Sequence, residues 1–146
     1  MSRNTPTQEY TYTLTRELDA SAAEVFAAWT TPARYERWAG AEAGSVEMDV
    51  RPGGAWKAVM VVPGGHRVPI GGSYREVAAD RRLVMDMEMP GASEPTVMTM
   101  ELAERADGGP TRLTLSQVCA TAEERDMAEE GSTMLLDSLT AHLAER

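Results

Sequence analysis

The chain has 146 residues, enough for one domain with a sizeable core, and its 14 lysines and arginines against 23 aspartates and glutamates give a net charge of −9. This acidity disfavours nucleic acid and anionic membrane surfaces as partners. The single cysteine, Cys119, excludes an internal disulfide framework, and the first residues lack the apolar run of a signal peptide or a membrane span, so we expect a cytoplasmic protein.

The chain begins with a polar tail at residues 1–7, and residues 8–146 are predicted to form a single domain. From residue 10 to residue 18, apolar and polar side chains alternate with the two-residue period of a strand. Arg16 falls on the inward phase of this strand. Because a buried arginine needs a partner, we expect Glu76 to pair with it.

Two short helices are predicted after this strand. Ser21 lies three residues before Glu24, which is the spacing of a capping box at the start of a helix. Pro32 then suits the first position of a second helix, and Gly40 is expected to end it. The pattern therefore predicts a helical pair between the first strand and the rest of the chain.

Residues 44–118 predict six antiparallel strands that are connected by turns rich in glycine and proline. The pair Gly71-Gly72 predicts a bulge or a sharp bend in the sheet. The most regular alternation lies in residues 81–89, where one face is apolar and the other is charged: Leu83, Met85, Met87 and Met89 against Asp86 and Glu88. We expect the charged face to meet water and the methionine face to meet the core.

The last segment, residues 121–146, predicts one helix of about 39 Å at about 1.5 Å per residue. On a helical wheel that starts at Met127, one narrow sector is small or polar along its middle and is flanked by Met134 and Leu139. We expect this sector to face the sheet. Because small and polar residues do not fill a core, the helix is predicted to cover a space. The sector contains Met127, Gly131, Leu135, Ser138 and His142.

The predicted order of elements is one strand, two short helices, six strands and one long helix. A sheet with one apolar face must pack against the amphipathic helix, which makes an α+β domain of two layers. If the sheet bends at Gly71-Gly72, it would grip the helix. The expected fold is therefore a curved antiparallel sheet of about seven strands around a long C-terminal helix.

Several segments of the chain resemble a known family. The segments are RELDAS at 16–21, VFAAWTTP at 25–32, DVRPGGAW at 49–56, GSYREV at 72–77 and GPTRLTL at 109–115. Together they resemble the START-like helix-grip (SRPBCC) superfamily, and more narrowly the branch named after the activator of Hsp90 ATPase. The resemblance implies the helix-grip fold. It does not imply one activity, since the superfamily includes binders, cyclases, hydrolase-like enzymes and regulators.

Relatives in this family often carry a tryptophan directly after the glycine that corresponds to Gly131, whereas this chain has Ser132. The sequence therefore does not decide whether a pocket mouth at this position is closed. In the family, stimulation of the Hsp90 ATPase also needs an additional N-terminal domain, which we do not expect here. The resemblance accordingly favours ligand binding over chaperone activity.

The leading hypothesis is that a small hydrophobic molecule binds in a methionine-rich cavity between the long helix and the sheet. The alternative is an ordinary core that methionine fills. Methionine is unbranched and adaptable, which would suit a ligand of variable shape. The predicted ligand-binding residues are Met48, Trp56, Met60, Met85, Met87, Met98, Met100, Gln117, Met127, Met134, Leu135 and Ser138.

Three polar residues are candidates for acid/base catalysis of a cyclase- or dehydratase-like reaction: Tyr74, Gln117 and His142. Each also has a structural interpretation. His142 could act as a general base, or it could pack near the helix C-terminus, where the helix dipole favours it. Gln117 could bond to a ligand or to a neighbouring strand. Whether the Tyr74 side chain points into the core or toward solvent depends on the bend at Gly71-Gly72.

We expect no metal and no cofactor, since the two histidines are far apart and the acidic residues do not cluster. Cys119 is expected to be a buried thiol rather than a nucleophile. The competing hypothesis for function is a non-catalytic regulatory or chaperone-associated interaction module. An exposed apolar patch on Tyr35 and Trp38 would favour that hypothesis, and a homodimer through these aromatic residues or through edge strands is also left open.

Overall fold

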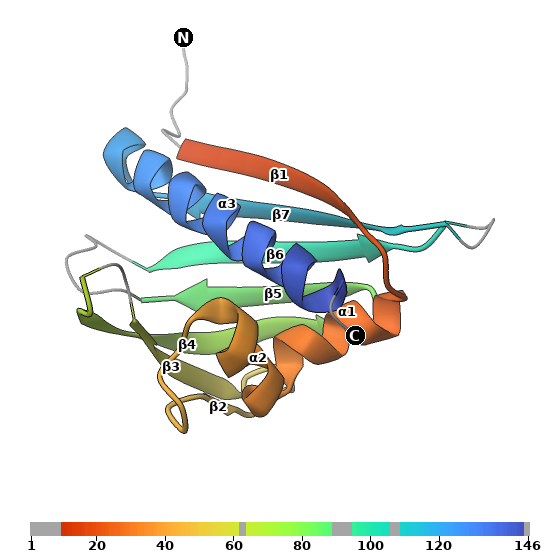
Figure 1. Ribbon diagram of the computed structural model, residues 1–146. Coiled ribbons are helices and arrows are strands. Elements are labelled where there is room, and N and C mark those ends of the chain that lie inside the picture. Colours follow the sequence, from red (N-terminus) through yellow and green to blue (C-terminus); the bar gives the residue numbers. More distant parts are fainter. Residues whose placement is uncertain (1–9, 62–63, 89–94, 106–108, 145–146) are drawn as a thin grey trace, which may run out of the picture.

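A computed structural model describes residues 10–61, 64–88, 95–105 and 109–144 (Figure 1). The predicted element order is confirmed. The elements are β1 (Tyr10–Leu18), α1 (Ala22–Thr30), α2 (Pro32–Ala39), β2 (Glu47–Met48), β3 (Ala55–Val61), β4 (Arg67–Ala78), β5 (Arg82–Met87), β6 (Thr96–Ala103), β7 (Thr111–Cys119) and α3 (Ala122–Ala144). The predicted tail and Met89 lie outside the described residues.

The strands form one antiparallel sheet in the order β1-β7-β6-β5-β4-β3-β2. In this order, the first strand of the chain pairs with the last, and Tyr10 lies opposite Cys119. Figure 1 shows α3 crossing one face of the curved sheet, with α1 and α2 beside its C-terminal end. The predicted α+β helix-grip architecture is therefore confirmed.

The helix ends follow the local chemistry of the sequence. The Ser21 hydroxyl accepts a hydrogen bond from the backbone N–H of Glu24 at 3.1 Å, which caps α1 as predicted. Gly40 ends α2 with a φ of 80°, a left-handed conformation that costs glycine little. Thr121 accepts from the backbone N–H of Glu124 at 3.1 Å and so marks the start of α3.

The glycine pair in β4 has a different role from the one predicted. The register shift of this strand lies between Tyr74 and Glu76, beyond the glycines. At Gly72, an added Cβ would stand 2.0 Å from the backbone oxygen of Asp86 in β5. Glycine is therefore required at this position because two strand backbones approach closely, and the prediction of a bulge at Gly71-Gly72 was wrong.

An aromatic cluster fills the space between the helical pair and the rest of the core. The ring of Trp38 lies 5.0 Å from that of Trp29 and 5.2 Å from that of Tyr35, both in edge-on geometry. The indole N–H of Trp38 donates to the backbone oxygen of Ala28 at 2.9 Å. Since Tyr35 and Trp38 are both buried, they do not form the exposed patch that the interaction hypothesis considered.

The face of α3 that contacts the core differs from the predicted face. Its buried side chains are Ser132, Leu136, Leu139 and Leu143, at intervals of four, three and four residues. Met127 is 73% exposed and Met134 is 57% exposed. The predicted orientation of the helix was therefore wrong, because the leucine stripe buries more apolar surface than the sector of small and polar residues would.

The predicted partner of Arg16 was also wrong. Arg16 reaches across to α3 and pairs with Asp137 at 3.3 Å. Glu76 instead pairs with Arg82 at 3.2 Å. The register shift in β4 separates Glu76 from the inward phase of Tyr74, so the carboxylate points to the exposed side of the sheet.

Candidate functional site

A chain of buried polar side chains connects the sheet to α3. Gln117 donates from Nε2 to the Thr96 hydroxyl at 2.7 Å and accepts at Oε1 from the Tyr12 hydroxyl. The Tyr12 oxygen lies 2.6 Å from the hydroxyl of Ser132 on α3. Because the single proton of Tyr12 is used on Gln117, Ser132 must donate to Tyr12. All four side chains are buried.

The pairing of the strands brings these polar side chains together. Tyr12 in β1 lies directly opposite Gln117 in β7, and Gln117 lies opposite Met98 in β6. Side chains on paired residues share a face, so Tyr12 and Gln117 both point toward α3. Gln117 was predicted to be a polar residue on an apolar face, whereas the parts played by Tyr12, Thr96 and Ser132 were not predicted. The inward phase of Tyr12 was visible in the sequence, whereas its partner strand was not.

Tyr12 stays protonated because it is buried. Burial is the largest cause that raises its pKa, to about 12, while the hydrogen bond with Ser132 acts in the opposite direction. A neutral phenol can donate one hydrogen bond and accept another at the same time. This suits the central place of Tyr12 among these hydrogen-bonded side chains. Gln117 thus has protein partners on both sides, and its structural interpretation accounts for its polarity.

Tyr74 differs from Tyr12 in that its hydroxyl has no hydrogen-bond partner among the described residues. The side chain is 1% exposed and lies opposite Met85 on the inward face of the sheet, which settles its facing. Burial raises the pKa of this phenol, and the nearby Tyr35 and Asp49 raise it further. Tyr74 therefore presents an unused hydrogen-bond donor inside an apolar core.

Two more buried nitrogen atoms have no partner within the described ranges. They are Nε1 of Trp29 in the aromatic cluster and Nε2 of His142 near the end of α3. No hydrogen bond there joins His142 to Tyr74 or Gln117. Tyr74 and Gln117 are buried and His142 is partly buried, and within the described ranges the three predicted catalytic candidates do not form a hydrogen-bonded group.

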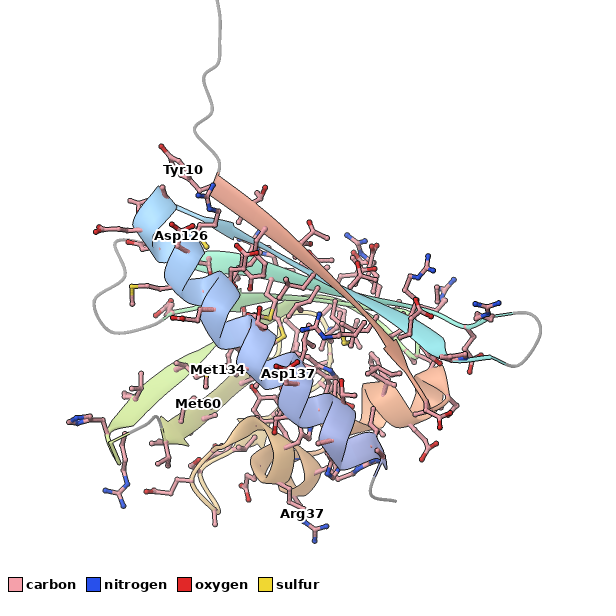
Figure 2. All side chains as sticks on the ribbon, turned by 45° about the horizontal axis from the view of Figure 1, so that its top comes forward. Tyr10, Arg37, Met60, Asp126, Met134 and Asp137 are labelled. Carbon is pink, nitrogen blue, oxygen red and sulfur yellow. The ribbon has the colours of Figure 1, made fainter. Side chains whose placement is uncertain are left out.

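The predicted ligand-binding residues divide into three groups. Trp56, Met85, Met98 and Met100 are buried in the core. A second group is partly buried and packs against that core: Met48, Met60, Met87 and Leu135. On α3, Met127 and Met134 are exposed, and the hydroxyl of Ser138 donates to the backbone oxygen of Trp38. Figure 2 shows Met134 at the side of α3 turned toward β3 and β4, the part of the sheet where Met60 is labelled.

A groove of about 450 Å³ is open on the face of the sheet opposite α3, where its lining includes Glu76, Arg82 and Arg112. In the described parts of the chain, no group of three His, Cys, Asp or Glu side chains is arranged to hold a metal ion. Cys119 is buried, and burial raises the pKa of its thiol.

Comparison with known proteins places the chain in a family. Residues 19–144 match the family described as "Activator of Hsp90 ATPase homolog 1-like protein". The chain belongs to this family. The match covers α1 through α3 and confirms the resemblance seen in the sequence. No curated protein matched the chain.

Solved structures with the same fold come from several bacteria. A protein from Rhizobium loti is 26% identical, with a TM-score of 0.74 over 92% of this chain and 96% of that chain. One from Nitrosomonas europaea is 25% identical, with a TM-score of 0.76 over 93% and 95%. A Staphylococcus aureus protein, titled as one of unknown function, is 21% identical with a TM-score of 0.77 over 94% and 95%, which shows likeness of fold alone.

The family and the helix-grip fold together support a ligand-binding or regulatory module. Across the described segments, we find no helix with the length and apolar character needed to cross a membrane.

Proposed function

We propose that the protein binds a small, largely apolar molecule between α3 and the inward face of the sheet, and that the molecule carries a hydrogen-bond acceptor. The observation that carries this proposal is the unpartnered hydroxyl of Tyr74. A buried donor without an acceptor costs about 1–3 kcal/mol, so an acceptor from a ligand would recover that cost.

The surroundings of Tyr74 support an apolar ligand. Met85 lies opposite it in the neighbouring strand, and Met98 and Met100 belong to the same core. Methionine side chains can adopt new rotamers at small cost, which would let this core open around a guest molecule. Partly buried Met60 and Met87 lie at the margin of the core and would contact the part of the ligand nearer to solvent.

The role that we propose for Tyr74 is to donate, not to accept a proton. Because its pKa is raised, the phenol keeps its proton at neutral pH. In a cyclase- or dehydratase-like reaction, it would polarise a carbonyl or hydroxyl oxygen as a hydrogen-bond donor. Gln117 would hold Tyr12 and α3 in place instead of contacting the ligand.

A panel of fatty acids, polyketides and aromatic compounds, scored by thermal shift, tests this proposal. At least one compound should stabilise the protein, and Tyr74→Phe should weaken its binding by about tenfold, the effect of one buried hydrogen bond. Without ligand, Tyr74→Phe should unfold no more easily than the parent protein, because the lost hydroxyl has no hydrogen-bond partner among the described residues. The matched control Tyr10→Phe removes the same atom at the start of β1 and should bind normally.

Two results would count against the proposal. One is the absence of any stabilising compound in the panel. The other is a stabilising compound whose affinity is the same for Tyr74→Phe as for the parent protein, because the hydroxyl would then have no part in recognition.

A regulatory interaction module is the second candidate function, and the exposure of Met127 and Met134 on α3 favours it. The family name also suggests the partner to test, which is Hsp90. An interaction module should change the ATPase rate of Hsp90, and Met127→Gln with Met134→Gln should abolish that change while leaving ligand-induced thermal shifts intact.

A further inference from the structure

The groove on the outer face of the sheet has its own chemistry. It lies over β4, β5, β6 and β7, on the side away from α3, and has a volume of about 450 Å³. Ala78, Ala103 and Thr114 contribute to its lining. All three lie on the outward phase of their strands, whereas Leu102, which also lines the groove, belongs to the buried core.

The arginines that line the groove differ in the number of carboxylates that they contact. Arg82 contacts two carboxylates, Glu76 at 3.2 Å and Glu101. Arg112 pairs with Glu17 of β1 at 2.7 Å. Arg81 also lines the groove, and in the described ranges no carboxylate pairs with it. Among the described residues, one arginine of this groove therefore has no ion-pair partner, in a protein whose net charge is −9.

The backbone holds Arg81 in place at the rim. Its N–H donates to the oxygen of Ala78 at 3.0 Å across the turn between β4 and β5. Its oxygen accepts from the N–H of Leu102 in β6 at 2.8 Å. The preceding residue, Asp80, has a φ of 64°, a left-handed conformation that aspartate tolerates better than most residues. Both backbone groups of Arg81 are thus anchored at the rim of the groove.

We infer that this groove binds a small organic acid whose carboxylate pairs with Arg81. A guanidinium matches a carboxylate in two parallel hydrogen bonds. Ala78 and Ala103 provide an apolar wall for the body of the molecule. Glu76 and Glu101 already occupy Arg82, and their charges disfavour a ligand with several negative charges. One arginine without an ion-pair partner among the described residues therefore suits a monoanion.

Titration of the isotopically labelled full-length protein with sodium benzoate, followed by amide NMR at constant ionic strength, tests this inference. Benzoate should cause saturable shifts at Ala78, Arg81, Ala103 and Thr114, and the neutral analogue benzamide should cause none. Arg81→Gln should weaken benzoate binding about tenfold, because it removes a charge-assisted pair.

The matched control is Arg37→Gln, which makes the same change in net charge on α2, a helix that packs against α3 (Figure 2). This variant should bind benzoate like the parent protein. Equal weakening by Arg37→Gln would show a general charge effect and would overturn the inference. Shifts that do not saturate, or that benzamide reproduces, would also overturn it. Thermal shift with the compounds that bind the core should be unchanged in Arg81→Gln, which separates the two sites.

Discussion

Tyr12 and Tyr74 are both buried on the inward face of the sheet, and the partners of their hydroxyls set them apart. The Tyr12 hydroxyl connects Gln117 of β7 to Ser132 of α3. The Tyr74 hydroxyl has no described partner. Since a satisfied polar group stabilises a fold and an unsatisfied one does not, Tyr12 belongs to the scaffold and Tyr74 is the residue with spare binding capacity.

The buried tyrosines also make stability sensitive to alkaline pH. Burial raises the pKa of Tyr12 and of Tyr35 to about 12, above the value of about 10 in an unfolded chain. The unfolded state therefore loses these protons first. The free energy of unfolding should fall as pH rises from about 10 through about 12, and urea denaturation over this range measures it. Tyr12→Phe should make the fall shallower, and an unchanged slope would contradict the role of Tyr12.

Residue roles were only partly predictable from the sequence. Gln117 stood out because it is polar at an apolar phase of its strand. Its partners could not be found in this way, since Tyr12 is 105 residues away and becomes a neighbour only through the pairing of β1 with β7. Ser132 is buried because it meets Tyr12, so its burial depends on that same pairing.

At the scale of elements, α3 shows how a helical wheel can indicate the wrong face. In the prediction, the small and polar residues of one helix sector were interpreted as the lining of a space beneath α3. The observed core face instead has one serine, Ser132, followed by three leucines at intervals of three and four residues. The strands were predicted well because a two-residue alternation has only two phases, whereas a helix can be rotated to any angle about its axis.

Gly131 gives a direct test of the orientation of α3. It lies on the exposed side of the helix, and an added Cβ would meet nothing within 4 Å. Because glycine weakens a helix interior, Gly131→Ala should raise the free energy of unfolding by about 0.5–1 kcal/mol in a denaturant titration. The matched change Gly72→Ala should lower it, since the new methyl would overlap the backbone of β5. Destabilisation by Gly131→Ala would argue for the originally predicted face.

At the scale of the whole molecule, the two ends of the chain are joined in one sheet and one core. Leu18 of β1 is fully buried, as are Leu139 and Leu143 of α3. The aromatic cluster of α1 and α2 belongs to the same core. That residues 8–146 form a single domain stays a prediction, which an unfolding experiment can test.

If the chain is one cooperative unit, Leu18→Ala should lower the stability reported by every probe. The expected loss is about 2–5 kcal/mol, because the substitution leaves a cavity in the core. Tryptophan fluorescence reports on Trp29, Trp38 and Trp56, all outside β1, and circular dichroism is dominated by α3. Both transitions should coincide and shift together. Two separate transitions would show that the ends of the chain fold independently.

The pairing of Tyr10 with Cys119 also means that β1 is synthesised long before its partner strand β7. The partners are 119 − 10 = 109 residues apart in the chain. At about 5–20 residues per second, a ribosome needs roughly 5–20 seconds to make the intervening segment. Throughout that interval β1 is without its partner strand, and the methionine-rich face of the nascent sheet is without the helix that will cover it. Until α3 has been synthesised, the apolar face of the sheet is thus open to contacts with other chains.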